Sequence, residues 1–513
     1  MTAVKLKLPP GLYKNGTDYQ AAGRWADSDL IRWHNDNIKP IFGWQVRTDL
    51  VLDAPLPPLW GDGTATEAAR SGMPLPDGTG GSNIFIGTNK KIYMLSNSNV
   101  VTNVTPAGFA AQPKNAVFDT GYGRFRYSFG QYGTPRPTPQ GNPINAFSWG
   151  FSEWGFWPIA CARDVSGQKL KIKRTTDAIF VDIANSPAGV MDAVVTDERF
   201  VMTVGNQTDF RRVQWCDQEN FDLWTPAIDN QAGGITLAGL GKLIRAKKVL
   251  GNVLIIGDND AFVSTYVGPP YVFGFTRIGT RCGIVGPEAI CVTDTFATWI
   301  GNKSFWIFDG TLRQLPCEIL DYYLADHNKQ QRSKTMGFTL ADYSECWWLY
   351  QSRGSETNEV DSYLVYNYAK KIWYKGRIDR TVGMDSDNLV YSCMVSSNGT
   401  VYDHDVESAG FDGRLPYILS GPLETANGER VMGLQYVYPD EQLDGDVRME
   451  LQCFGMPNEG MRFSRDFELL SPTSTQGIMA RDIRMKLYSA GIHPSWTVGD
   501  FRILPIKGVA PQR

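Results

Sequence analysis

The sequence predicts a mainly β protein: a six- or seven-bladed β-propeller with a small additional β platform domain. A unit made of an apolar strand, a tight turn and a second apolar strand recurs along the chain at a period of about 40 to 50 residues, as in propeller blades. The composition, with 52 glycines, 29 prolines and 12% aromatic residues, is typical of many short strands joined by turns. Patterns with the helical period are scarce.

Three copies of the unit are clear. They begin at Asn83 (Asn-Ile-Phe-Ile-Gly-Thr-Asn), at Val253 (Val-Leu-Ile-Ile-Gly-Asp-Asn) and at Ala297 (Ala-Thr-Trp-Ile-Gly-Asn-Lys). Their Gly, Asn and Asp residues predict two-residue turns with positive φ angles. Looser copies lie near Phe156, Phe200, Trp347 and Cys393.

The spacing of the copies sets the expected number of blades. From Phe156 through Phe200, Val253, Thr298, Trp347 and Cys393 the steps are 44, 53, 45, 49 and 46 residues. With the copy near Phe85 there are seven units, and a propeller often closes by pairing its first and last strands. The alternative fold is a pair of β-sandwiches.

The period defines the expected domains. Residues 46–420 form the propeller, with an insertion at about 108–150 that contains the proline-rich run 134–143 and projects from the ring. Residues 1–45 and 421–513 fall outside the period and together form the platform. The segment from Glu318, with apolar positions 319, 320, 323 and 324, predicts one short helix in an insertion.

Both ends of the chain carry apolar residues that a propeller alone would leave exposed. Such residues form contacts between copies of the chain or a core of their own. They are Trp25, Leu30, Ile31, Trp33, Ile41, Phe42 and Trp44 near the start, and Leu434, Tyr436, Val437, Tyr438, Leu451, Phe454 and Trp496 near the end.

Charge and cysteine usage argue against several function classes. The formal net charge is -4, from 50 basic and 54 acidic residues, which gives no basic surface for gripping nucleic acid. No apolar run is long enough for a signal peptide or a membrane span. The eight cysteines contain no Cys-x-x-Cys pair, so we expect small buried hydrophobic residues rather than a zinc or redox site.

Candidate chemical sites are few, and we expect no catalytic, metal or cofactor site. Asp403-His404-Asp405 has metal-binding residue types but follows a hairpin turn, so it more simply ends a strand. Asp385-Ser-Asp387-Asn388 lacks the glycine and distal glutamate of a calcium loop and predicts a turn. The segment Ser396–Tyr402 is weakly similar to a sialidase aspartate box but lacks its aspartate.

The aromatic and basic clusters also have simple explanations. Trp306 and Trp347-Trp348 fall inside expected blade strands, where aromatic residues are favoured. The basic pairs Lys90-Lys91 and Lys247-Lys248 are predicted to be solvated turns.

Several longer segments resemble the packaged-DNA stabilisation, or tail nozzle, proteins of short-tailed, podovirus-type bacteriophages. Near the start they are Pro9–Thr17, Gly23–Trp25, Asp29–Trp33 and Lys39–Trp44; the later ones are Gln214–Pro226, Gly268–Phe275, Arg281–Pro287, Trp299–Gly301 and Ser420–Glu424. The resemblance covers most of the chain except the proline-rich insertion.

The resemblance implies a structural virion protein, made in the host cytoplasm, that is neither an enzyme nor a membrane protein. It would form a homohexameric ring at the distal end of the phage tail, below the adaptor ring that sits under the portal. The ring would retain packaged double-stranded DNA, let it pass through the lumen during ejection, and carry tail fibre, spike or needle proteins. The alternatives are a carbohydrate-binding or glycan-cleaving propeller of a tail fibre or spike, and a scaffolding propeller without a viral role.

Overall fold

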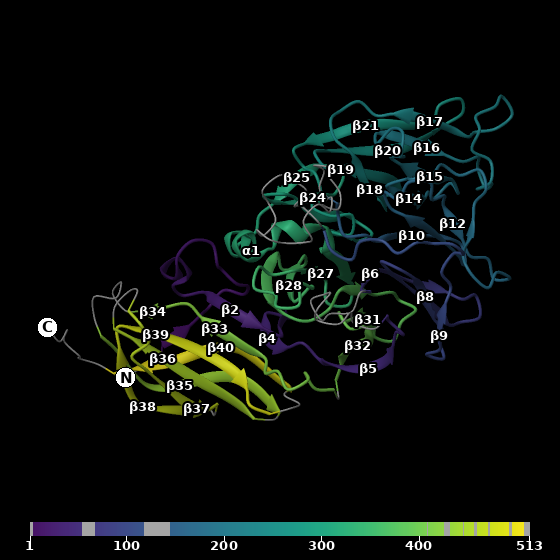
Figure 1. Ribbon diagram of the computed structural model, residues 1–513. Helices are drawn as coiled ribbons and strands as arrows, with labels where there is room; N and C mark the ends of the chain where they lie inside the picture. Colours follow the sequence, from purple (N-terminus) through teal and green to yellow (C-terminus); the bar gives the residue numbers. More distant parts are fainter. Residues whose placement is uncertain are drawn as a thin grey trace, which may run out of the picture.

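The computed structural model describes residues 4–53, 67–116, 144–407, 409–424, 431–444, 446–455, 459–469, 472–491 and 495–506. Its main body is a β-propeller of seven four-stranded antiparallel sheets (Figure 1). The expected mainly β fold and propeller are confirmed, with seven blades.

Each of the first six blades is a simple meander of four consecutive strands. Blade 1 is β6 (Ala69–Pro76), β7 (Ser82–Thr88), β8 (Ile92–Leu95) and β9 (Val101–Asn103), and blade 2 is β10 (Trp149–Trp154), β11 (Trp157–Ala162), β12 (Lys171–Ile172) and β13 (Val181–Asp182). Blade 3 is β14 (Asp192–Val195), β15 (Val201–Val204), β16 (Arg212–Trp215) and β17 (Gly233–Thr236), and blade 4 is β18 (Leu243–Val249), β19 (Asn252–Gly257), β20 (Asp260–Gly268) and β21 (Val272–Thr280). Blade 5 is β22 (Ile290–Val292), β23 (Ala297–Ile300), β24 (Phe305–Phe308) and β25 (Leu312–Leu315), and blade 6 is β26 (Met336–Leu340), β27 (Glu345–Tyr350), β28 (Ser362–Asn367) and β29 (Ile372–Arg377).

The seventh blade closes the ring with a strand from the beginning of the chain. Its first three strands are β30 (Val382–Met384), β31 (Ser392–Val395) and β32 (Thr400–Val406), and its outermost strand is β5 (Gly43–Asp49). The first strand of this blade, β30, contacts β6 of blade 1. Closure by the two ends of the propeller removes the exposed sheet faces that an open row of blades would have.

The repeat found in the sequence corresponds to the second strand of each blade. The copies near Phe85, Phe156, Phe200, Val253, Thr298, Trp347 and Cys393 lie at β7, β11, β15, β19, β23, β27 and β31. These strands carry apolar runs because both faces of a central strand pack against neighbouring blades. In β27, all six residues are buried.

The turns of the three clearest copies differ from the prediction. The paired residues on either side are Gly87 and Ile92, Ile256 and Ala261, and Ile300 and Phe305, so each loop has four residues. None of these loop residues has a positive φ angle. Four-residue loops are mostly built around a type I turn, which needs no left-handed residue.

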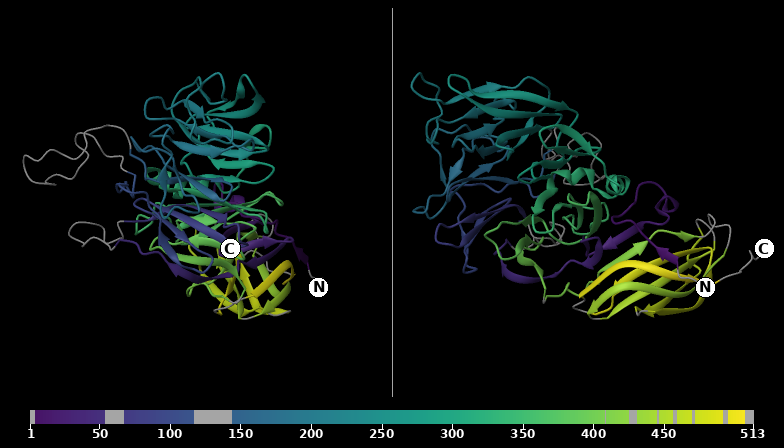
Figure 2. Two further views of the ribbon diagram at one scale, coloured as in Figure 1. Left: turned by 90° about the vertical axis from the view of Figure 1, so that its right-hand side faces the viewer. Right: turned by 180° about the vertical axis from the view of Figure 1, so that it is seen from behind.

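The two ends of the chain form a β-sandwich beside the propeller (Figures 1 and 2). One sheet has the order β3 (Ile31–His34), β4 (Asn37–Pro40), β40 (Ser495–Pro505), β35 (Met432–Asp444) and β38 (Thr473–Ala480), with β1 (Val4–Leu6) on β40. The other has the order β2 (Trp25–Asp29), β33 (Tyr417–Ser420), β39 (Asp482–Ser489), β36 (Val447–Phe454) and β37 (Phe463–Glu468), with β34 (Leu423–Glu424) on β39.

The apolar residues at the chain ends mostly form the core of this sandwich. Trp25, Leu30, Ile31, Trp33, Leu434, Val437, Leu451 and Trp496 are all buried within one chain, and among them Leu30 and Trp33 contact Tyr363 and Tyr374 of blade 6. The alternation of buried and accessible positions in β36 is that of a sheet with one face on a core. These side chains therefore cannot serve as contacts between copies.

Short helices lie in the connections. They are η1 (Asp18–Ala21), α1 (Leu320–Asp326) and η2 (Lys329–Lys334), and α1 confirms the predicted short helix. Strand β5 begins at Gly43 and belongs to the propeller, whereas β33 begins at Tyr417 and belongs to the sandwich, so both ends cross between the two bodies slightly before the expected boundaries. The proline-rich run 134–143 lies outside the described residues. Within the described part of the chain, no helix is both long and apolar enough to span a bilayer.

Candidate functional site

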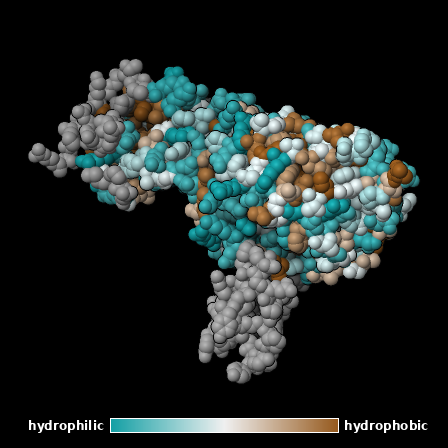
Figure 3. Space-filling model, turned by 90° about the horizontal axis from the view of Figure 1, so that it is seen from above, coloured by the Kyte–Doolittle hydropathy of each residue, from teal (hydrophilic) through white to brown (hydrophobic). Residues whose placement is uncertain are grey.

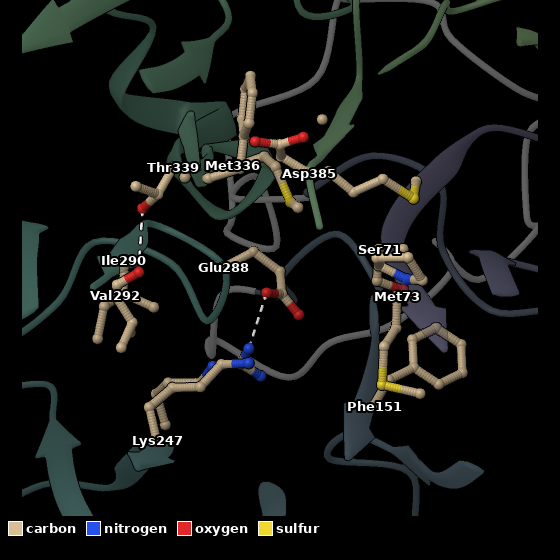
Figure 4. A pocket seen from close by; sticks show the side chains of 17 residues that line it. Ser71, Met73, Phe151, Lys247, Glu288, Ile290, Val292, Met336, Thr339 and Asp385 are labelled. Atoms are coloured by element: carbon tan, nitrogen blue, oxygen red, sulfur yellow. Dashed lines mark hydrogen bonds and ion pairs between the residues drawn. The ribbon is translucent and has the colours of Figure 1, made fainter. Parts of the chain in front are cut away.

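The central funnel of the propeller is the first candidate site. It has a volume of about 260 Å³ and is lined by first strands of six blades. Figure 4 shows the side chains arranged around it, with charged groups on Lys247, Glu288 and Asp385. Arg245, Ser71 and Thr339 also line it, and the apolar side chains of the wall are Met73, Phe151, Ile290, Val292, Met336, Phe338 and Met384.

A buried network of four charges lies beside the funnel, and two of its members, Arg245 and Glu288, are part of the funnel wall. Arg245 binds Asp192 at 3.2 Å and Glu288 at 3.0 Å, and Arg163 binds the same two carboxylates. The four residues come from four consecutive blades or their connections and are all buried. Since removing charges from water is costly unless they are paired, the network balances two guanidinium groups against two carboxylates.

The carboxylates of the funnel do not form a ready acid–base pair. Glu288 accepts hydrogen bonds from two arginines, which commits it to the ion network. Burial raises the pKa of Asp385, and the nearby Asp342 carboxylate also raises it, against a backbone hydrogen bond from Ser386. Glycoside cleavage normally uses two carboxyl groups, one as the acid and the other as the base or nucleophile. Glu288 is instead held in the buried ion network by its two arginine partners.

The segment Asp403-His404-Asp405 lies within β32 and is divided among different partners. Asp403 pairs with Arg47 at 2.8 Å, and Asp405 pairs with Arg32 at 2.7 Å. The Nε2 atom of His404 accepts a hydrogen bond from Arg380, and burial lowers the pKa of this histidine well below its usual value. Within the described residues, no group of three or more His, Cys, Asp or Glu side chains could hold a metal ion.

The other candidates from the sequence take ordinary structural positions. Asp387 and Asn388 form the expected turn between β30 and β31. The segment Ser396–Tyr402 forms the β31–β32 hairpin, and Trp306, Trp347 and Trp348 lie in blade strands. Seven of the eight cysteines are buried, and Cys317 is half-buried.

The prediction that Lys247 and Lys248 lie in a solvated turn is wrong. Both are in the inner strand β18, where alternating residues face opposite sides. Lys247 lines the funnel, and Lys248 pairs with Asp197 at 3.2 Å. Lys90 and Lys91 do lie in the β7–β8 turn.

The joint between the sandwich and the propeller is the second concentration of buried polar groups. Arg32 of β3 is 1% exposed and binds both Glu345 of β27, at 2.8 Å, and Asp405 of β32, at 2.7 Å. The Tyr343 ring lies 3.4 Å from the guanidinium carbon of Arg32. One side chain of the sandwich thus ties together two blades.

Two further contacts fasten the joint. The carboxylate of Asp29 accepts a hydrogen bond from the backbone N–H of Arg377 and pairs with Arg414. Trp44 donates a hydrogen bond to Asp412 and stacks at an angle on His404. Arg377 and Asp412 had no predicted role, Trp44 was predicted as an apolar contact or core residue, and His404 was considered only as part of a metal-binding cluster.

Comparisons with known proteins establish no family. No family model matches the sequence, and no curated protein matches it. A YCF48 structure from Cyanidioschyzon merolae is similar at 9% identity and a TM-score of 0.38, covering 71% of this chain and 98% of that chain. PorZ of the Porphyromonas gingivalis type-IX secretion system is similar at 11% identity and a TM-score of 0.35, covering 81% of this chain and 44% of that chain.

Proposed function

We propose that this protein is a structural component of a short-tailed phage tail, a nozzle subunit that forms a hexameric ring at the distal end of the tail tube. In this proposal the ring docks below the adaptor ring, retains packaged DNA and provides the channel for its ejection. The protein acts mechanically and catalyses no reaction.

The observation that carries the proposal is the position of the segments that resemble the nozzle family. None of them contributes a residue to the lining of the funnel. The segments Asp29–Trp33 and Lys39–Trp44 supply Asp29, Arg32 and Trp44 of the joint. These two segments therefore belong to the architecture and none of the resembling segments to the funnel, which is the expected pattern for a structural protein and the opposite of that for an enzyme with a funnel active site.

The DNA channel in this proposal is formed between copies of the chain. The funnel of one propeller has a volume of about 260 Å³, with Arg245 and Glu288 of the buried ion network in its wall, so it is too small for a duplex to pass through. A ring generated by head-to-tail contacts has its lumen on the symmetry axis.

The outer edge of the sandwich is the surface we assign to the contact between copies. Among the described strands, β37 pairs only with β36, which leaves its other edge free. Phe463 at its start is 40% exposed, with Met461 at 51% and Met479 of β38 at 45%. Exposed edges with apolar side chains are natural templates for pairing with another chain.

Native mass spectrometry and negative-stain imaging of the purified full-length protein test the proposal. We expect hexamers and rings with a central hole. Phe463→Asp should abolish the rings, whereas Val100→Asp, at a more exposed apolar residue of blade 1 (57% against 40%), should leave them intact. A protein that stays monomeric at all concentrations, and does not assemble with portal and adaptor rings, would overturn the nozzle assignment.

On the side seen from above in Figure 3, the described residues of the propeller form no single large apolar face. Apolar side chains are interspersed with hydrophilic ones over the side that is seen from above. This pattern fits a propeller that projects from the ring while the sandwich makes the contacts between copies.

A further inference from the structure

A second groove, distinct from the funnel, lies on blade 3 beside its connection to blade 2. It has a volume of about 300 Å³. Its main lining residues are Asn185, Asn206, Gln207, Gln214, Trp224 and Thr225. Gln214, Trp224 and Thr225 belong to the segment Gln214–Pro226, which the proposed nozzle function leaves without a role.

The side-chain amides of this groove are held in fixed orientations. Asn206 accepts hydrogen bonds through Oδ1 from Thr208 and Asp209, and donates through Nδ2 to Oε1 of Gln214 at 3.1 Å. Oε1 of Gln207 accepts from the Ser166 hydroxyl at 3.1 Å and from the Gly167 N–H at 2.9 Å. These contacts determine which end of each amide is the oxygen.

The opposite ends of the same amides are available to a ligand. Within the described residues, Nε2 of Gln207 and Nε2 of Gln214 have no protein acceptor. Asn185 donates through Nδ2 to the Asp222 carbonyl at 3.0 Å, which leaves its Oδ1 atom as an acceptor. The groove therefore presents two donors and one acceptor whose positions are set before a ligand arrives.

The chemistry of the lining selects the ligand class. No charged side chain is among the described residues that line the groove. A charged ligand would lose hydration there without gaining an ionic partner. Fixed neutral donors and acceptors, with the buried Trp224 also in the lining, suit a ligand that is neutral and rich in hydroxyl groups.

We infer that this groove is a binding site for a neutral glycan, in which Gln207 and Gln214 donate hydrogen bonds to sugar oxygens and Asn185 accepts one from a sugar hydroxyl. The site lies within one chain and does not require the ring. A failure to bind glycans would therefore not contradict the nozzle function, and a failure to form rings would not contradict the glycan site. Binding involves no covalent step.

Isothermal titration calorimetry with the full-length protein tests the inference. The neutral probes are maltoheptaose, laminarihexaose and mannohexaose, and the charged probe is a heparin-derived hexasaccharide. We expect at least one neutral probe to bind with a Kd below about 1 mM, and the heparin fragment not to bind.

Gln207→Glu and Gln214→Glu are the decisive variants. Each keeps the oxygen that accepts the hydrogen bonds from the protein and replaces the outward NH₂ donor by a second oxygen. Each should weaken binding at least tenfold, with an unchanged melting temperature. The matched control Gln314→Glu, at an exposed position of β25 in blade 5, should bind like the unaltered protein.

Three results would overturn the inference. They are an absence of binding by all three neutral probes, binding by the heparin fragment alone, and neutral-glycan binding that persists in both variants. If a variant proves less stable, Thr225→Val, which removes a hydroxyl from the groove rim without touching the amide contacts, replaces it and should also weaken binding.

Discussion

The propeller and the sandwich differ in how far apart in the sequence their paired strands lie. Six blades of the propeller are meanders of consecutive strands, and only the seventh borrows a distant strand, β5. In the sandwich, strands from the first 40 residues pair with strands from the last 100: Trp25 lies opposite Ser420, and Ile38 opposite Val498. The propeller is thus built from local contacts, whereas the sandwich forms only when the two ends of the chain meet.

This difference makes the joint the place where the two bodies depend on each other. The chain crosses between them at residues 42–44 and again at 409–412, and Trp44 of the first crossing contacts Gly410 and Phe411 of the second. Contacts that are far apart in sequence stabilise a fold only after a long loop has closed. We therefore expect substitutions in the joint to affect stability more than comparable substitutions elsewhere.

The largest effect is expected for Arg32→Ala. The substitution leaves Glu345, which is fully buried, without its guanidinium partner and also removes the partner of Asp405. Removing one member of a buried ion pair typically costs about 3–5 kcal/mol. Urea titration should show a loss of this size in the free energy of unfolding.

Lys5→Ala is the matched control for Arg32→Ala. Lys5 pairs with Asp500 on the sandwich surface, where the two side chains are 58% and 43% exposed. Exposed pairs contribute about 0–1 kcal/mol. Equal losses for the two variants would show that the joint is no more important than the surface.

Gly43→Ala is expected to have the next largest effect. A β-carbon at Gly43 would lie 2.1 Å from the carbonyl oxygen of Ala409, so the two crossings of the chain could not stay in contact. Overpacking costs about 1–3 kcal/mol. Thermal unfolding should therefore shift downward, whereas Gly354→Ala, which meets nothing within 4 Å, should leave it nearly unchanged. A stable Gly43→Ala protein would mean that the crossings can separate freely.

A smaller, pH-dependent effect is expected at His327, which lies in the connection between blades 5 and 6. Burial, together with the charges of Arg332 and Lys329, lowers its pKa from 6.5 to about 4. Above pH 6.5 neither the folded nor the unfolded state holds the proton. As the pH falls from 6.5 towards 4, the unfolded state takes up the proton and the folded state does not, so stability decreases.

At pH 5 this difference corresponds to about 2 kcal/mol, at about 1.4 kcal/mol per pKa unit. His327→Phe keeps a ring against Tyr323, whose centroid is 4.9 Å away, and removes the titrating group. The variant should lose less stability than the unaltered protein between pH 7 and pH 5, as measured by urea titration at each pH. An identical pH dependence in both proteins would exclude His327 as a source of acid sensitivity.

The sequence predicted the propeller better than it predicted the funnel, the joint and the groove on blade 3. Second strands such as Val253–Gly257 and Ala297–Ile300 are buried on both faces and stand out as apolar runs. The funnel is lined by first strands such as β6, where Ser71, Gly72, Met73 and Pro74 form no such run. Residues more than 300 positions apart in the sequence, such as Ser71 and Asp385, line the same funnel. No local sequence pattern indicates that such residues lie close together.

The joint and the glycan groove were missed for related reasons. Arg32 and Asp405 are 373 residues apart, and their pairing depends on how the sandwich docks. In the groove, the informative feature is which end of each amide is already bonded, and this depends on neighbours such as Ser166, 41 residues before Gln207. A buried charge inside an apolar strand, as in Leu243-Ile-Arg245-Ala, was the one available signal of the ion network.

The smallest effect is expected for Lys247→Met, and it separates pairing from position within the funnel. Lys247 and Arg245 are two residues apart in β18 and both line the cavity. Arg245 bonds to Asp192 and Glu288, whereas no carboxylate of the described residues lies within 4.0 Å of Lys247. Removing Lys247 should change the free energy of unfolding by less than about 0.5 kcal/mol.

Arg245→Met should cost about 1.5–3 kcal/mol, as expected for hydrogen bonds to charged groups, since Arg163 still neutralises part of the carboxylate charge. Urea titration of both variants distinguishes the two contributions. A loss at Lys247 as large as that at Arg245 would mean that charge in the funnel, rather than the paired ion network, stabilises the propeller.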